Sequence, residues 1–170
     1  MTFRLVEANT PSQYAAARLL IEEYAAQIGA LMGVDLSFQN FAAELNQLPE
    51  MYGPPSGCLL LASGVAEWVG CCALRRFEDG VCEMKRLYIR PSARGTKLGR
   101  QLAESVVVKA RMLGYRRMVL DTLQDMIAAQ TLYRSLGFRD TQPYYFNPMA
   151  GVTYMELNLG AAESHVGDAH

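Results

Sequence analysis

A short loop rich in glycine and basic residues carries the clearest chemical signal in the sequence. It runs from Arg94 to Arg100 (Arg-Gly-Thr-Lys-Leu-Gly-Arg) and joins a predicted strand to a predicted helix. The first N–H groups of a helix lack partners and carry partial positive charge, and glycines let an anion come close to the backbone. The loop therefore predicts a phosphate or pyrophosphate cradle. The alternative is that Gly and Arg serve only the geometry of the turn.

A second pattern lies downstream, in a predicted helix that ends at a glycine. Residues 128–138 read Ala-Ala-Gln-Thr-Leu-Tyr-Arg-Ser-Leu-Gly-Phe, and Gly137 is a typical helix stop. Tyr133 places a phenol, a potential proton donor, on this helix. The upstream loop has neither the G-x-x-x-x-G-K-[ST] nor the G-x-G-x-x-G pattern, so a nucleotide-phosphate binder is the weaker interpretation.

The order and spacing of these two segments resemble the GNAT family of N-acetyltransferases, over roughly 57–159. That family's acetyl-CoA loop reads Gln/Arg-x-x-Gly-x-Gly/Ala, and Arg94 and Gly99 match its ends, whereas Lys97 replaces the middle glycine. The family's later block reads Asn-x-x-Ala-x-x-Leu-Tyr-x-x-x-Gly-Phe. Its Leu-Tyr-x-x-x-Gly-Phe core is intact, whereas Met126 replaces the leading Asn.

The resemblance implies an enzyme that transfers the acetyl group of acetyl-CoA to a primary amine of a small molecule or protein, by direct attack in a ternary complex. The alternative is a non-catalytic acyl-CoA-binding domain of the same fold. The resemblance also implies backbone contacts to acetyl-CoA from a splayed strand and from the loop. The residues expected to bind acetyl-CoA are Leu87, Tyr88, Ile89, Arg94, Gly95, Thr96, Lys97, Leu98, Gly99 and Arg100.

Two side chains are candidates for proton transfer. Tyr133 matches the family tyrosine beside the CoA sulfur and would protonate the departing thiolate; the alternative is a core tyrosine. Glu83 lies four residues before Leu87 on the same strand, at an offset where some family members carry a general base. An equally supported alternative is a strand carboxylate paired with Lys85 or Arg75.

The acceptor is not identified by the sequence. An aromatic loop at 142–151, with Tyr144, Tyr145 and Asn147, is as compatible with an acceptor wall as with simple packing. Three glutamates of the N-terminal helices could attract a cationic amine, although solvated helix faces are the favoured interpretation. These glutamates are Glu22, Glu23 and Glu44.

Hydrophobic spacing predicts the elements that position these residues. A capping box at Thr10–Gln13 opens a long helix, and Asp79-Gly80 predicts a hairpin. A strand, helix and parallel strand follow one another at 81–89, 98–113 and 118–122. The other expected strands are 3–8, 57–62, 67–75, 138–145 and 152–159, and the other expected helices are 37–48, stopped at Pro49, and 127–136. Together with the resemblance, these elements imply an α/β (α+β) fold: a mixed, mostly antiparallel sheet of about six to seven strands with helices on both faces, of the acyl-CoA N-acyltransferase type.

Composition bounds the remaining possibilities. The net charge is −1, so we expect no general attraction for nucleic acid or membrane. The length of 170 residues suits one domain, expected at 1–159, followed by a flexible tail at 160–170. The four cysteines predict buried free thiols in the cytoplasm. The two histidines lie in the tail, so we expect no metal. The resemblance also implies a homodimer as one expected assembly.

Overall fold

The strands from Cys58 to Ile89 are rich in apolar residues because they lie between two layers of helices. The computed structural model describes residues 2–32 and 40–160. In β2 (Cys58–Ser63), Leu59 and Leu61 pack into one hydrophobic cluster, whereas Leu60 and Ala62 pack into another on the opposite face. A strand that is buried on both faces reads as a continuous apolar run rather than as an alternating one.

The sheet has seven strands in the order β1-β2-β3-β4-β5-β7-β6. All neighbouring pairs are antiparallel except β4 and β5, which are parallel. Besides β2, the strands are β1 (Arg4–Glu7), β3 (Trp68–Glu78), β4 (Val81–Ile89), β5 (Arg117–Leu123), β6 (Arg139–Asp140) and β7 (Val152–Asn158). The predicted fold class and the parallel crossover between β4 and β5 are therefore confirmed.

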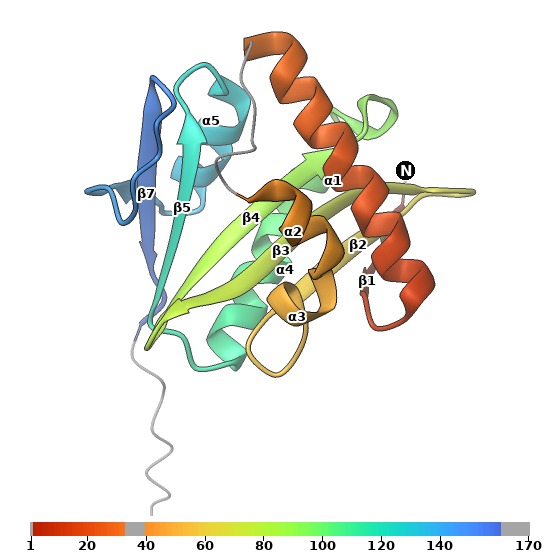
Figure 1. The fold of residues 1–170 in the computed structure, drawn as a ribbon, viewed down its shortest axis with the longest axis horizontal. Helices are drawn as coiled ribbons and strands as arrows, with labels where there is room; N and C mark the ends of the chain where they lie inside the picture. The colour runs from red at the N-terminus through yellow and green to blue at the C-terminus, as the bar shows by residue number, and fades with distance from the viewer. Residues whose placement is uncertain (1, 33–39, 161–170) are drawn as a thin grey trace, which may run out of the picture.

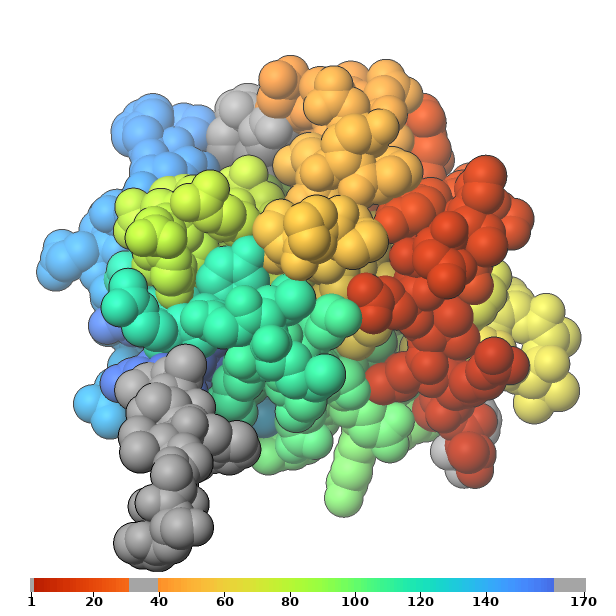
Figure 2. All heavy atoms as spheres, turned by 90° about the horizontal axis from the view of Figure 1, so that it is seen from below, coloured from red at the N-terminus to blue at the C-terminus, as the bar shows by residue number. Residues whose placement is uncertain are grey.

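Helices cover both faces of this sheet, as Figure 1 shows. One face carries α1 (Pro11–Met32), α2 (Phe41–Asn46) and α3 (Leu48–Tyr52). The other carries α4 (Leu98–Met112) and α5 (Ile127–Ser135). Seen from below, α4 occupies the middle of the surface between N-terminal residues in red and C-terminal residues in blue (Figure 2).

The parallel strands β4 and β5 separate after a short paired region. Their register covers only Val81↔Arg117, Cys82↔Met118 and Glu83↔Val119. Beyond Glu83 the two strands diverge like the arms of a V (Figure 1). The second half of β4 therefore presents an unpaired edge toward β5.

A β-bulge sits at the start of this open edge. Between the pairs Ala73↔Lys85 and Cys71↔Tyr88, β4 contains one residue more than β3. The bulge contains Arg86, whose backbone is left-handed, with φ 60°. A bulge re-aims the side chains around it and is frequent beside active sites.

Three local predictions are confirmed in atomic detail. The capping box forms reciprocally: the Gln13 N–H donates to Thr10 Oγ1 at 3.2 Å, and the Thr10 N–H donates to Gln13 Oε1 at 3.2 Å. The Asp79-Gly80 hairpin joins β3 to β4, with Gly80 at φ 74°. All four cysteines are buried and free.

Two element predictions are wrong. Pro49 does not stop a helix. It stands in the first turn of α3, where its missing N–H costs nothing. The strand expected over 138–145 is only the two residues of β6, followed by one more bond, from the Thr141 N–H to Tyr154 O, and Pro143 has no N–H with which to extend the ladder further.

Parts of two further predictions lie outside the described residues: the start of the helix at 37–48 and all but the first residue of the 160–170 tail. Among the described residues, no helix is both long enough and apolar enough to cross a bilayer.

Candidate active site

A long groove follows the open edge of β4 and has a volume of about 540 Å³. Five of the residues predicted to bind acetyl-CoA line it: Leu87, Tyr88, Ile89, Arg94 and Gly99. Its other walls come from α1, from α5 and from the turn before α5. These lining residues are Tyr24, Gln27, Ile28, Asp125, Met126, Ile127, Ala128, Ala129 and Leu132. We call this space the outer groove.

Backbone N–H groups of β4 point toward the outer groove at alternate residues. The Arg90 N–H donates to Val69 O of β3 at 2.8 Å. Strand alternation then places the N–H of Tyr88 on the β3 edge as well, and those of Leu87 and Ile89 on the open edge. Two of the three predicted N–H groups can therefore reach a ligand in the groove.

The N-terminus of α4 closes one end of the groove. Within the described chain, no acceptor is bonded to the N–H groups of Leu98, Gly99 and Arg100, and the first helical bond to the preceding loop is that of the Gln101 N–H to Lys97 O. A Cβ added at Gly99 would meet only Ile89 Cγ1 at 3.7 Å and Leu132 Cδ2 at 3.8 Å, so the backbone is open to an approaching anion. These unpaired donors fit a pyrophosphate.

Lys97 adopts the backbone conformation that the glycine of the family pattern would favour. It precedes α4 with φ 65° and ψ 15°, in the left-handed region. Gly95 is also left-handed, at φ 78°. The loop thus keeps its turn despite the Lys97 replacement, at a cost of about 1 kcal/mol for a residue with a Cβ.

The three basic side chains of the loop are not equivalent. Arg94 donates to Ile89 O at 3.1 Å and to Gln27 of α1 at 2.9 Å. Arg100 binds Glu104 at 2.8 Å and Ser135 at 2.8 Å. Lys97 is exposed, and no described residue bonds to its ammonium group. Lys97 is therefore the side chain most available to a phosphate.

The remaining loop residues hold the loop in its conformation. Thr96 donates its hydroxyl to Ala93 O at 2.6 Å, and Leu98 is buried in the core. Neither residue lines the groove, and neither does Gly95 or Arg100. Their contribution to a ligand would come through the backbone.

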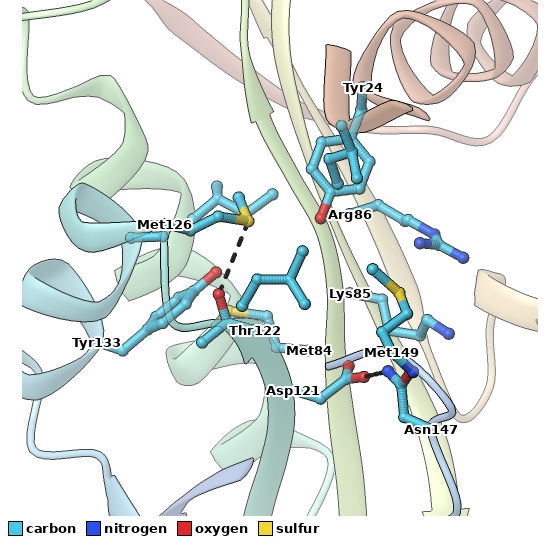
Figure 3. A pocket seen from close by; sticks show the side chains of 14 residues that line it. Tyr24, Met84, Lys85, Arg86, Asp121, Thr122, Met126, Tyr133, Asn147 and Met149 are labelled. Carbon is cyan, nitrogen blue, oxygen red and sulfur yellow. Dashed lines mark hydrogen bonds between the residues drawn. The ribbon is translucent and has the colours of Figure 1, made fainter. Parts of the chain in front are cut away.

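A second, smaller space lies deeper between β4 and β5, and we call it the inner cavity. Its volume is about 60 Å³, and it shares Tyr24, Ile28, Leu87, Met126 and Ala129 with the outer groove. Figure 3 shows side chains converging on it from α1, β4, β5, α5 and the 142–151 loop. The residues found only here are Met84, Lys85, Arg86, Asp121, Thr122, Leu123, Tyr133, Asn147 and Met149.

Two tyrosines present hydroxyl groups to the inner cavity from different helices. Tyr133 of α5 is 8% exposed, packs against Phe138 and directs its hydroxyl toward Thr122 and Met126 (Figure 3). Tyr24 reaches in from α1. Burial raises the pKa of Tyr133 well above its ordinary value and that of Tyr24 to about 12. Both phenols therefore hold their protons at neutral pH.

Met126 stands where the family pattern has Asn. It precedes α5, lines both spaces, and its sulfur accepts a weak hydrogen bond from Thr122 at 3.9 Å. A thioether has no N–H to offer a ligand. The wall at this point is therefore apolar where that pattern has an amide.

Asp121 of β5 provides a carboxylate to the inner cavity. It accepts hydrogen bonds from the Tyr145 hydroxyl and from Asn147 Nδ2, the latter at 3.0 Å (Figure 3). Both donors are neutral, and Asp121 has no salt bridge among the described residues. Asn147 lines the cavity itself. The aromatic loop at 142–151 thus contributes to the wall.

Glu83 lies outside both spaces. It is 1% exposed, and both of its oxygens are engaged: Oε1 accepts from Arg75 at 2.7 Å and Oε2 from the Tyr144 hydroxyl at 2.6 Å. The alternative pairing with Arg75 is therefore present. A role as base would require one of these partners to move.

A buried ion pair supports the bulge of β4. Arg86 donates to both carboxylate oxygens of Glu44, at 2.8 and 2.9 Å, and its guanidinium lies over the ring of Phe41. Burial opposes ionisation of Glu44, but the hydrogen bonds and charge of Arg86 outweigh it and lower the pKa of Glu44. This pair joins α2 to the strand that borders both spaces.

The view that the N-terminal glutamates cover solvated helix faces is wrong for Glu44, and Glu23 is partly exposed but paired. Glu44 is 2% exposed, and Glu23 binds Arg90 at 2.7 Å, holding α1 against the end of β4. Glu22 forms the ordinary exposed pair, with Arg18 at 3.1 Å. Arg86 of β4 attracts the carboxylate of Glu44, and Arg90, directly after β4, attracts that of Glu23.

The sequence did not point to a site role for several residues of the inner cavity, among them Tyr24, Lys85 and Asp121. Tyr24 followed the apolar spacing of α1, and Lys85 entered only as a partner for Glu83. Asp121 interrupts the apolar run 118–123, and a lone carboxylate in a buried strand is the one signal that could have found it. In the described ranges, no three His, Cys, Asp or Glu side chains are grouped to hold a metal.

Comparison with known proteins agrees with this geometry. A model of the Acetyltransferase (GNAT) family matches residues 18–138, so the chain belongs to that family. An uncharacterized N-acetyltransferase of Schizosaccharomyces pombe is 44% identical over 84% of this chain and 86% of its own length. This likeness and the family match make the chain an N-acetyltransferase of the GNAT type.

Two solved structures share the fold. A GNAT acetyltransferase from Staphylococcus aureus has a TM-score of 0.76 at 21% identity and covers 93% of this chain and 99% of its own. An acetyltransferase from Salmonella typhimurium, solved with acetyl-CoA, has a TM-score of 0.63 at 21% identity, covering 94% of this chain and 95% of its own.

Proposed function

We propose that this enzyme binds acetyl-CoA in the outer groove and passes its acetyl group directly to a primary amine held in the inner cavity. The main support is that the outer groove and the inner cavity share five wall residues. Tyr133 lines the inner cavity near Met126, which is one of the shared residues. A thioester lying along β4 would thus have the acceptor on one side and a buried phenol near its sulfur.

The chain supplies each element of acyl transfer. The N–H groups at the start of α4, with Lys97, would hold the pyrophosphate. The N–H groups of Leu87 and Ile89 would bind the pantetheine arm and polarise the thioester carbonyl. The amine nitrogen attacks the carbonyl carbon, the C–S bond breaks, and the thiolate takes the proton of the Tyr133 hydroxyl.

The amine must also lose a proton before or during attack. Asp121 reaches the inner cavity and is our candidate to accept that proton, directly or through water. Glu83, the candidate from the sequence, lies behind Tyr144 and holds it in place through a 2.6 Å hydrogen bond. In this proposal Glu83 is a positioning residue, and it acts as the base only if Tyr144 moves aside.

The second candidate function is acyl-CoA binding without catalysis. The replacements at Lys97 and Met126 favour it, because both remove features of the family pattern. The buried phenol of Tyr133 favours catalysis, since a binder has no use for an acid beside the sulfur.

The Tyr133→Phe variant tests the proposal through thiol release from acetyl-CoA with a panel of amines. Loss of the acid should lower kcat by about 10²- to 10⁴-fold while leaving the affinity for CoA unchanged. Tyr24→Phe removes the other phenol and is the matched control, with an expected loss below about tenfold. CoA binding without turnover of any amine by the wild-type protein would instead support the second function.

The cytoplasmic location and the homodimer are still predictions. Four free thiols, all buried, are what a reducing cytoplasm permits, and we propose that compartment. Homodimerisation is tested by light scattering of the purified chain.

A further inference from the structure

One cation in the inner cavity, Lys85, has no partner among the residues that the structure describes. Lys85 lines the cavity, and no described residue makes a salt bridge or hydrogen bond with its ammonium group. The arginines around it are all paired: Arg75 with Glu83, Arg86 with Glu44, and Arg90 with Glu23. The carboxylates nearest to Lys85 are therefore already engaged by other donors.

The environment of Lys85 favours an incoming anion. On β4 and the elements paired with it, Lys85, Arg75 and Arg86 carry three positive charges and Glu83 and Glu44 two negative ones, while the third carboxylate, Asp121, lies on the opposite strand of the cavity. Burial lowers the pKa of Lys85, and the charge of Arg86 lowers it further. A ligand carboxylate would stabilise this ammonium group by completing its ion pair.

The opposite strand offers the complementary charge. Asp121 of β5 faces the same cavity and is bonded only to neutral groups, the Tyr145 hydroxyl and the Asn147 amide. Lys85 and Asp121 do not form an ion pair with each other. The cavity thus holds a cation and an anion on separate strands, as the binding of a zwitterion requires.

The rest of the cavity limits the size of its occupant. Its volume of about 60 Å³ suits a small molecule rather than a folded protein surface. The walls that are not charged come largely from short or flexible apolar side chains. These are Ile28, Met84, Leu87, Leu123, Met126, Ala129 and Met149.

We propose that the acceptor is a small primary amine that carries a carboxylate, as an α-amino acid with an apolar side chain does. Its carboxylate binds Lys85, and its amine lies at Asp121 before attacking the thioester. The reaction yields the N-acetylated acid and free CoA, with the amine proton leaving by way of Asp121. This inference rests on the proposed function, because it assigns the acceptor of the same site.

The test compares matched acceptors that differ only in the carboxylate. Leucine, leucinamide and 3-methylbutylamine keep, mask and remove that group, and the same comparison extends over other apolar amino acids. Wild-type kcat/KM should favour the free acids by about 10- to 100-fold, the range for a hydrogen bond to a charged group. Lys85→Met should lower kcat/KM for the free acids far more than for the simple amines and so abolish the preference, and Lys85→Arg should retain part of it.

Several results would overturn the inference. Equal rates with acids, amides and simple amines would do so, as would faster acetylation of peptides than of free amino acids. An equal fall for all acceptors in Lys85→Met would mean that the residue only supports the structure.

Binding separates failure of this inference from failure of the proposed function. Calorimetry of the same three ligands in the presence of CoA measures recognition without turnover. Carboxylate-dependent binding that Lys85→Met removes, without acetyl transfer, would support recognition of the carboxylate by Lys85 and overturn the proposed function, and with it the role of the ligand as acceptor. Absence of both binding and transfer would overturn the two together.

Discussion

The outer groove and the inner cavity share five wall residues but present different chemical groups to a ligand. The outer groove offers backbone donors along β4 and at the start of α4, with mostly apolar side chains around them. The inner cavity offers side chains: two phenols, an ammonium group, a carboxylate and an amide. A backbone-lined groove suits one co-substrate shared by a whole family, whereas a side-chain-lined cavity can be changed residue by residue to select an acceptor.

The largest expected effect lies at the Glu44–Arg86 pair, which is buried and supports the inner cavity. Glu44→Ala leaves a buried guanidinium without its carboxylate and should lower the free energy of unfolding by about 3–5 kcal/mol. Urea denaturation measures this loss. Glu22→Ala, which breaks the exposed pair with Arg18, is the control and should cost less than about 1 kcal/mol. Equal losses in the two variants would remove the special role of the buried pair.

The same pair gives stability a defined pH dependence. Because folding lowers the pKa of Glu44, its stabilising contribution is complete above the unfolded value of about 4.3 and is lost as the pH falls through the lower folded value. Glu44→Gln should therefore show a shallower loss of stability than the wild type between about pH 4.3 and pH 2. Parallel curves would contradict this assignment.

The two regions also differ in how far the sequence predicts them. The cradle residues Arg94–Arg100 are contiguous, so their pattern is visible without a fold. Hydrophobic spacing predicts the strands and helices, and the family resemblance implies how they assemble. The inner cavity joins Tyr24, Lys85 and Asp121 from three distant segments. No spacing along the chain brings them together. Their meeting depends on the divergence of β4 from β5 and on the Arg86 bulge, which are tertiary features.

The sequence also misjudges charged groups whose partners lie far along the chain. Glu44 looks like a surface residue of a short helix, yet its partner is 42 residues away on β4. By contrast, the turn at Lys97 survives the loss of a glycine because a lysine can adopt the left-handed conformation at modest cost. Local replacements are thus easier to interpret than long-range pairs.

The smallest expected effect lies at Lys97, the exposed cation of the loop before α4, whose N-terminus closes one end of the outer groove. Lys97→Ala should weaken CoA binding by about two- to fivefold and reduce its salt dependence, because the side chain is exposed and screened. Lys97→Arg should restore binding. Isothermal titration at two salt concentrations measures both effects, and an unchanged affinity in the alanine variant would assign pyrophosphate binding to the backbone alone.

Gly99 provides the most direct test that acetyl-CoA occupies the outer groove. Calorimetric titration of CoA into Gly99→Glu should show a loss of affinity of at least about 100-fold, because a carboxylate would enter the cradle beside the phosphates. Gly99→Ala is the matched control. Its Cβ meets neighbours only at 3.7 and 3.8 Å, so it should bind CoA within about threefold of the wild type. A folded Gly99→Glu protein with wild-type affinity for CoA would contradict the placement of the co-substrate in this groove.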